Sequence, residues 1–274
     1  MTKHFTAAFV LTCTLAFSAL MPLVPIAAAP APATVPATAP ATQSGADDRD
    51  LRIGRVKTGR AAGQFMKWHE AYVARAKQGD VDIVFLGDSI TAGWRKAPEL
   101  WAQRYEPLKA VNFGIGGDGV QHVLWRVENG ELDGISPRLV VLMIGTNNTA
   151  GREADRIAEG IERLVGVIRQ KCPRAKVLLL AIFPRERPDD RRQMGVIKEI
   201  NERIAKLDDG KTIRFLDIGA RFLDENGKLR KDLMPDGLHP GPAGYAVWAD
   251  AMQPTLDEML AGQKSRPHPA PQPK

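Results

Sequence analysis

The stretch VFLGDSITAGW (residues 84–94) begins as an apolar run and then changes to small and polar residues. Its apolar part belongs to the run 81–87, which has the length and composition of a buried strand. Gly87, Asp88 and Ser89 then form a turn, and two interpretations of that turn compete. Glycine, aspartate and serine are ordinary loop residues. A serine in a small, flexible turn directly after a strand is also a good position for a nucleophile. The other loops of the chain distinguish these two interpretations.

The sequence around this stretch alternates between apolar runs and amphipathic segments. Strands are expected at residues 81–87, 110–113, 139–144, 177–183 and 213–218. Helices are expected at residues 98–105, 120–129, 153–170, 193–207 and 243–260, with one more before the first strand at about 63–78. Continuous apolar strands between amphipathic helices indicate a parallel sheet covered on both faces. We therefore predict an α/β fold, a three-layer α/β/α sandwich with a parallel, flavodoxin-like five-stranded sheet.

The two ends of the chain differ from this pattern. Residues 1–29 combine Lys3 and His4 with an apolar stretch (5–23) and three alanines (27–29), which is typical of a secretory signal peptide. The alternative is an uncleaved membrane anchor, because the run is close to spanning length, but Pro22 and Pro25 oppose a continuous helix. We predict cleavage and a secreted or periplasmic protein without stable membrane insertion.

An Ala/Pro/Thr-rich linker at residues 30–50 and a Pro-rich tail at 263–274 are expected to be disordered. The remainder, residues 51–262, is expected to form one domain. Cys172 is the only cysteine after the signal, so no disulfide within the mature chain is expected. No Cys/His cluster has zinc spacing.

The net charge of the chain is +6. Its basic residues are interspersed with acidic ones, so they form no basic stripe that could bind nucleic acid. The mixed run RERPDDRR (185–192) is expected to be a solvated loop.

Three predicted strands end in glycine plus polar residues. Ligands in such sheets bind beyond the carboxyl ends of the strands. Gly87-Asp88-Ser89 follows the first strand, NFGIGGD (112–118) the second, and GTNN (145–148) the third. Any one of these segments could be loop filler, but three on one edge indicate a site. Gly117 could offer its backbone N–H and Asn147 its amide to an oxyanion.

The late loop PDGLHP (235–240) places an aspartate three residues before a histidine. The Asp236 carboxylate can then meet one imidazole nitrogen of His239 and leave the other to face Ser89. That is the orienter–base–nucleophile arrangement of acyl transfer. The alternative for this loop alone is a P-D-G turn with a surface histidine. Together with Ser89 at a strand end, the catalytic interpretation is the better one.

These segments resemble the blocks of the SGNH, or GDSL-type, hydrolase family. Ile90 stands where the family name has leucine, and Asn148 where many members have aspartate. The resemblance implies that Ser89 is the nucleophile, His239 the base and Asp236 its partner. It also implies an oxyanion hole formed by the Ser89 and Gly117 N–H groups and the Asn147 side chain.

A closer likeness lies in NFGIGGDGVQHVLWRVENGEL (112–132), which is similar to the catalytic subunits of the intracellular platelet-activating-factor acetylhydrolases. The likeness runs over residues 84–260. It implies hydrolysis of short, acetyl-type esters with no metal and no organic cofactor. Those relatives are cytoplasmic, whereas the leader here predicts export, so the natural substrate stays open between a small ester, a lipid and a polysaccharide.

Other functions remain as alternatives. An acyltransferase would use the same Ser–His pair with an alcohol in place of water, and a non-catalytic domain of this type could bind carbohydrate. Gly114, Gly116 and Gly119 satisfy a dinucleotide fingerprint, but they follow the second strand rather than the first, and the third strand does not end in an acidic residue. The sequence leaves the oligomeric state open, a homodimer included.

Overall fold

The computed structural model describes residues 50–187 and 191–263. The predicted signal, the linker except Asp50, and the tail except Gln263 lie outside these ranges and stay predictions. Within them, no helix is both long enough and apolar enough to cross a membrane.

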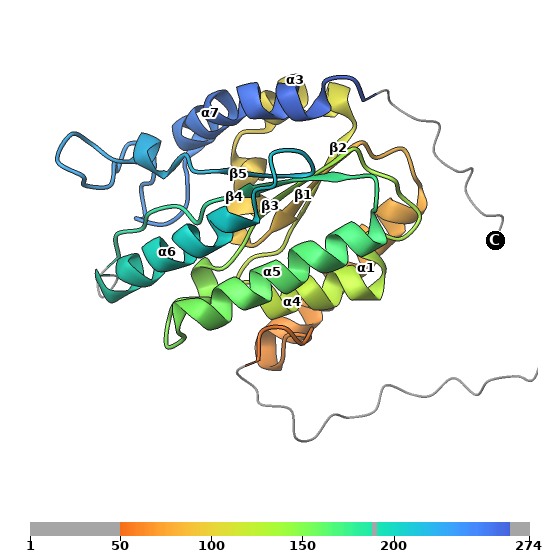
Figure 1. Cartoon of the computed structure of the whole chain (residues 1–274), viewed down its shortest axis with the longest axis horizontal. Helices are drawn as coiled ribbons and strands as arrows, with labels where there is room; N and C mark the ends of the chain where they lie inside the picture. Colours follow the sequence, from red (N-terminus) through yellow and green to blue (C-terminus); the bar gives the residue numbers. More distant parts are fainter. Residues whose placement is uncertain (1–49, 188–190, 264–274) are drawn as a thin grey trace, which may run out of the picture. The chain divides into compact units, whose positions relative to one another are not determined.

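The core of the described part of the chain is one five-stranded sheet (Figure 1). All neighbouring strands pair in parallel, in the order β2-β1-β3-β4-β5. The strands are β1 (Ile83–Gly87), β2 (Ala110–Gly114), β3 (Leu139–Met143), β4 (Lys176–Leu180) and β5 (Ile213–Leu216). This is the flavodoxin-like strand order, and the predicted fold class is confirmed.

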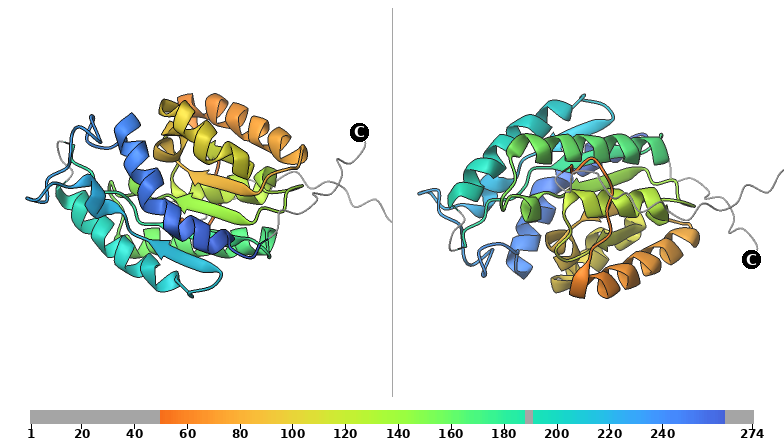
Figure 2. Two further views of the ribbon diagram at one scale, coloured as in Figure 1. Left: turned by 90° about the horizontal axis from the view of Figure 1, so that it is seen from above. Right: turned by 90° about the horizontal axis from the view of Figure 1, so that it is seen from below.

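Helices cover both faces of the sheet, as Figures 1 and 2 show. One face carries α1 (Ala62–Lys77), α4 (Val120–Arg126), α5 (Ala154–Lys171) and α6 (Arg191–Ile204). The other face carries α3 (Pro98–Arg104) and α7 (Pro242–Leu260), together with the short α2 (Ser89–Ala92) and η2 (Gly93–Lys96) after β1. The remaining short turns are η1 (Gly59–Ala61), η3 (Glu106–Leu108), η5 (Thr146–Asn148), η6 (Ala205–Leu207) and η7 (Gly219–Phe222).

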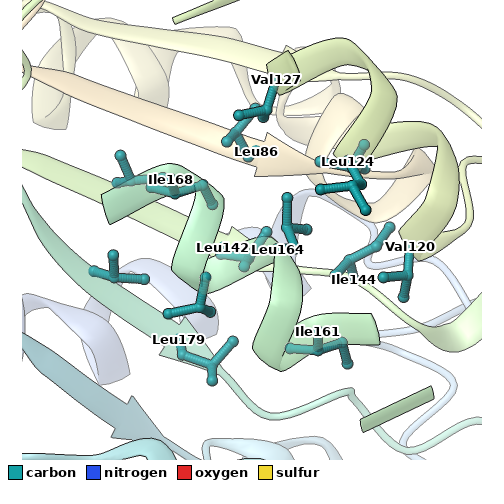
Figure 3. Packing of buried hydrophobic residues seen from close by; sticks show 14 of the residues in the cluster. Leu86, Val120, Leu124, Val127, Leu142, Ile144, Ile161, Leu164, Ile168 and Leu179 are labelled. Carbon is teal, nitrogen blue, oxygen red and sulfur yellow. The ribbon is translucent and has the colours of Figure 1, made fainter. Parts of the chain in front are cut away.

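The apolar runs bury side chains on both faces because successive strand residues point to opposite sides. In β1, Val84 and Leu86 enter the core beneath α4 and α5, whereas Ile83 and Phe85 enter the core beneath α7. Figure 3 shows the first of these cores, where α5 places Ile161, Leu164 and Ile168 over the strands. Cys172 is buried and unpaired as a thiol.

The structure corrects the predicted helix at 120–129. The α-helix ends at Arg126, and a wider π-type turn, η4 (Val127–Glu131), follows it. Gly130 has φ +108°, a conformation that favours glycine and cannot continue an α-helix. The turn brings the Glu131 carboxylate back to the guanidinium of Arg126, and both side chains are fully buried.

Candidate active site

The nucleophile candidate lies at the carboxyl end of β1. Asp88 caps α2, and its Oδ1 accepts a hydrogen bond from the Ile90 N–H at 2.9 Å. Ser89 is the first residue of that helix and is half-buried. Gly87 is required here, because a Cβ at this position would lie 2.4 Å from the Met143 carbonyl oxygen. The close approach of β1 and β3 therefore sets the position of the serine.

The last helix holds this turn from the other side. Tyr245 of α7 is fully buried and donates a hydrogen bond to the Ile90 carbonyl at 2.7 Å. A Cβ on Gly93 would lie only 2.0 Å from the Tyr245 hydroxyl oxygen, so this contact also depends on a glycine.

The loops after β2 and β3 meet beside Ser89. Gly116 faces the serine, since a Cβ built on Gly116 would lie 3.9 Å from Ser89 Cβ. Gly117 has φ +71°. Asn147 Nδ2 donates to the Asp118 carbonyl at 2.8 Å and lies 3.5 Å from Asp88 Oδ2, which is too long for a strong hydrogen bond. The amide of Asn147 is thus fixed in orientation, with one N–H only weakly engaged.

The late loop completes the arrangement. His239 Nε2 lies 2.8 Å from Ser89 Oγ, and His239 Nδ1 lies 2.7 Å from Asp236 Oδ2. The other carboxylate oxygen of Asp236 accepts the N–H groups of Leu238 and His239 at 3.0 and 2.7 Å. Partial burial acts to raise the pKa of Asp236, but these hydrogen bonds outweigh it and hold that pKa well below its ordinary range.

All of the predicted site residues therefore lie at one edge of the sheet. A hydroxyl, an imidazole and a carboxylate form a continuous chain of hydrogen bonds, although Ser89 and His239 are 150 residues apart in the sequence. Such a chain can move a proton from the serine to the histidine while the carboxylate fixes the ring. The catalytic and oxyanion-hole roles of the individual residues stay predictions.

Two arginines beside the site were missed. The prediction of a solvated loop at 185–192 missed the contacts that its described residues make with the site, such as Arg187 Nη2 with Asp236 Oδ2 at 2.8 Å. Arg185 Nη1 donates to the carbonyl and hydroxyl oxygens of Thr146 at 3.2 and 3.1 Å. Alternating charges give no sign of these contacts, since the same composition is typical of exposed loops.

A buried ionic cluster beneath the glycine loop was also missed. Arg126 donates through Nε to Asp118 Oδ2 at 2.9 Å and through Nη1 to Glu131 Oε2 and to the Phe113 carbonyl. Glu131 also meets Nδ1 of His69 at 3.1 Å. The one available signal is the presence of Arg126 and Glu131 within the predicted helical segment 120–132, which also contains Glu128. The cluster ties the loop after β2 to the end of α4.

His69 and His122, the other histidines in the described part of the chain, do not face Ser89. His69 is buried against Glu131 and Trp125. His122 accepts a hydrogen bond from the Gly119 N–H through Nδ1 at 2.9 Å and so caps α4. Burial lowers the pKa of His122 to about 4, and the nearby charges of Lys57 and Arg126 act in the same direction. Within the described ranges, no cluster of His, Cys, Asp and Glu could hold a metal ion.

The Asp88→Asn variant should lose less free energy of unfolding than the wild type when the pH rises from 5 to 8. Burial raises the pKa of Asp88 to about 7, and the neighbouring Asp118 charge adds to the rise. The folded protein then keeps a proton that the unfolded chain releases above about pH 4, so stability falls as the pH rises toward 7. Between pH 5 and 8 the wild type should lose on the order of 2 to 3 kcal/mol relative to the variant, at 1.36 kcal/mol per pKa unit.

Urea unfolding of both proteins at the two pH values measures this difference. The exposed Asp257→Asn is the matched control and should follow the wild type. Parallel pH curves for wild type and Asp88→Asn would show that Asp88 is already ionised in the folded protein at pH 5.

Comparison with known proteins agrees with the geometry. The model of the GDSL-like lipase/acylhydrolase family matches residues 85–247, more than half of the chain. The chain is 37% identical over 201 residues to platelet-activating factor acetylhydrolase IB subunit alpha1 of Homo sapiens, which covers 73% of this chain and 85% of that protein. The Bos taurus protein of the same name is 37% identical over 216 residues, covering 77% and 91%.

Solved structures share the fold. A putative acylhydrolase from Bacteroides fragilis is similar with a TM-score of 0.61 at 24% identity, covering 74% of this chain and 100% of that one. A GDSL-like lipase from Bacteroides thetaiotaomicron is similar with a TM-score of 0.59 at 23% identity, covering 72% and 98%.

Proposed function

Because the chain belongs to the GDSL-like lipase/acylhydrolase family and is therefore a carboxylic ester hydrolase, we propose that it is an exported serine esterase for short-chain acyl esters. In this proposal Ser89, His239 and Asp236 form the catalytic triad. The observation that carries it is the hydrogen-bonded chain from Ser89 Oγ through His239 to Asp236, with links of 2.8 and 2.7 Å.

The first half of the reaction transfers the acyl group to the enzyme. Ser89 Oγ attacks the ester carbonyl while His239 Nε2 takes the hydroxyl proton, and the Asp236 carboxylate stabilises the imidazolium. The tetrahedral intermediate collapses when the bond to the alcohol oxygen breaks. His239 gives its proton to that oxygen, so the alcohol leaves neutral and the acyl group stays on Ser89.

The second half repeats these steps with water. His239 takes a proton from the water as its oxygen attacks the acyl carbonyl, and then returns the proton to Ser89 Oγ when the carboxylic acid leaves. In both halves the negative charge on the carbonyl oxygen needs preorganised donors. The Ser89 N–H, the Gly117 N–H and the weakly engaged amide of Asn147 are proposed for this task.

The substrate class rests on the relatives, which carry the name acetylhydrolase and are 37% identical to this chain. A short acyl group is therefore proposed, on an alcohol whose identity is open. Export rests on the sequence pattern of residues 1–29 alone. Fractionation of cells that produce the protein tests export, and its amino-terminal sequence tests removal of the leader. Protein found only in the cytoplasm would contradict export, and an intact leader on the exported protein would contradict cleavage.

A series of p-nitrophenyl esters from acetate to decanoate tests the proposed specificity. Acetate and butyrate should be cleaved at least about tenfold faster than decanoate, because an extra methylene that a pocket cannot hold lowers kcat/KM by roughly tenfold or more. EDTA should leave the rates unchanged, since the proposed mechanism uses protein groups only. A preference for decanoate would remove the short-chain assignment, and EDTA-sensitive turnover would contradict the mechanism.

A further inference from the structure

The segment 50–58, which precedes η1 and α1, lies beside the loop 115–119 that follows β2 and contributes to the proposed active site. It is fixed against α4, where the Arg55 N–H donates to the Gln121 carbonyl at 2.9 Å. Gly54 allows this close packing, because a Cβ there would lie 2.9 Å from the backbone of Trp125. The segment thereby places the side chain of Lys57 against the loop that follows β2.

The ammonium group of Lys57 is buried and has three partners. Its Nζ donates to the Gly116 carbonyl at 2.6 Å and pairs with Asp118 Oδ1 at 2.7 Å. It also lies 5.7 Å from the centre of the Phe65 ring. The side chain is 8% exposed and that of Asp118 is 0% exposed. Arg126 holds the second oxygen of Asp118 at 2.9 Å, so the carboxylate is fixed from both sides.

The Gly116 carbonyl belongs to the same peptide group as the Gly117 N–H. That N–H makes no hydrogen bond to any residue that the structure describes, and it is one of the proposed oxyanion donors. A cation on the carbonyl oxygen draws electron density away from the nitrogen, because linked hydrogen bonds polarise one another. A charged donor does this more strongly than a neutral one.

We infer that Lys57 is a positioning residue of the esterase, a role that rests on the proposed function. Its charge polarises and orients the Gly116–Gly117 peptide, which strengthens the Gly117 N–H as a donor to the oxyanion. Lys57 does not touch the substrate and acts only through this peptide group. The interaction should therefore lower the energy of the transition state and leave ground-state binding of the ester nearly unchanged.

The test compares Lys57→Met and Lys57→Gln, which remove the charge, with Lys57→Arg, which keeps it. Loss of a whole oxyanion donor lowers kcat by about 10² to 10³, so loss of its polarisation should lower kcat for p-nitrophenyl acetate by roughly 10-fold to 100-fold. KM should change by less than about twofold, since uniform binding is not affected. Lys57→Arg should be faster than both neutral variants.

A trifluoromethyl ketone gives the readout that a merely structural lysine would not move, because its adduct with Ser89 carries a negatively charged oxygen. Its inhibition constant should rise in parallel with the loss of kcat. The matched control is Lys171→Met. The ammonium group of Lys171 pairs with Asp133 at 2.9 Å on the surface, and its removal should change neither kcat nor the inhibition constant. Thermal unfolding checks that each variant is folded. If Lys57→Met does not fold, Lys57→Gln replaces it in the comparison with Lys57→Arg.

A folded neutral variant with kcat within about threefold of the wild type would overturn the inference, as would a lower kcat with an unchanged inhibition constant. These outcomes leave the proposed function intact as long as wild-type hydrolysis requires Ser89. A wild type whose esterase activity survives Ser89→Ala would instead remove the proposed function itself.

Discussion

Replacement of Ser89 with alanine is expected to reduce kcat for a short acyl ester by roughly 10⁴- to 10⁶-fold, as loss of the nucleophile does in other serine hydrolases. The side chain lies 2.8 Å from His239 Nε2 at the edge of the sheet, and no neighbouring hydroxyl occupies an equivalent position in the described part of the site. KM should change far less than kcat, because the hydroxyl contributes to bond formation and little to ground-state binding. Steady-state hydrolysis of p-nitrophenyl acetate measures both constants.

Ser136→Ala is the matched control. Ser136 is half-buried and precedes β3, so it lies at the amino ends of the strands, whereas the site lies at their carboxyl ends. The variant should therefore keep wild-type activity. Reaction with a fluorophosphonate followed by peptide mapping gives an independent check. The label should lie on Ser89 in the wild type and in Ser136→Ala, and labelling of a different serine would contradict the assignment of the nucleophile.

Replacement of His239 with alanine should have the second largest effect, a loss of about 10⁴-fold or more in kcat. Without the imidazole, none of the residues that the structure describes offers Ser89 Oγ a base at hydrogen-bond distance, and the departing alcohol loses its acid. The Asp236 carboxylate cannot replace the imidazole, because its Oδ2 is held 2.8 Å from Arg187 and its other oxygen by two backbone N–H groups. The same ester assay, with folding checked by circular dichroism, measures the loss.

His122→Gln is the control for this histidine. Glutamine keeps an acceptor for the Gly119 N–H, which His122 Nδ1 accepts at 2.9 Å, so activity should stay close to that of the wild type. A folded His239→Ala protein with more than a tenth of wild-type kcat would show that a different group acts as the base.

Much of the fold could be predicted from the sequence because the strands are buried on both faces. Continuous apolar runs such as Leu139–Met143 have no other common explanation between amphipathic helices. The site was predictable for a related reason: parallel strands bring their carboxyl ends together, so Ser89 and Asn147 had to share an edge. Asp236 and His239 could be paired because they are close in sequence and separated by a glycine.

The contacts that could not be predicted join residues far apart in the chain. Lys57 and Gly116 are separated by 59 positions, and Lys57 lies in a segment with no periodic pattern. The pairing of Arg126 with Glu131 depends on the π-type turn, whose residues also suit a regular helix up to Gly130. Arg187 reaches Asp236 across 49 positions from a run whose mixed charges look like those of any exposed loop.

The packing of α7 against the turn after β1 affects the order of events during folding. The Tyr245 hydroxyl meets the Ile90 carbonyl across 155 positions, and His239 meets Ser89 across 150. Contacts of such long range form late, because a large loop must close before they contribute any free energy. An intermediate with most helices and several paired strands would therefore have no competent site. During refolding, ester hydrolysis would report the last docking step, whereas the far-ultraviolet signal would report the earlier ones.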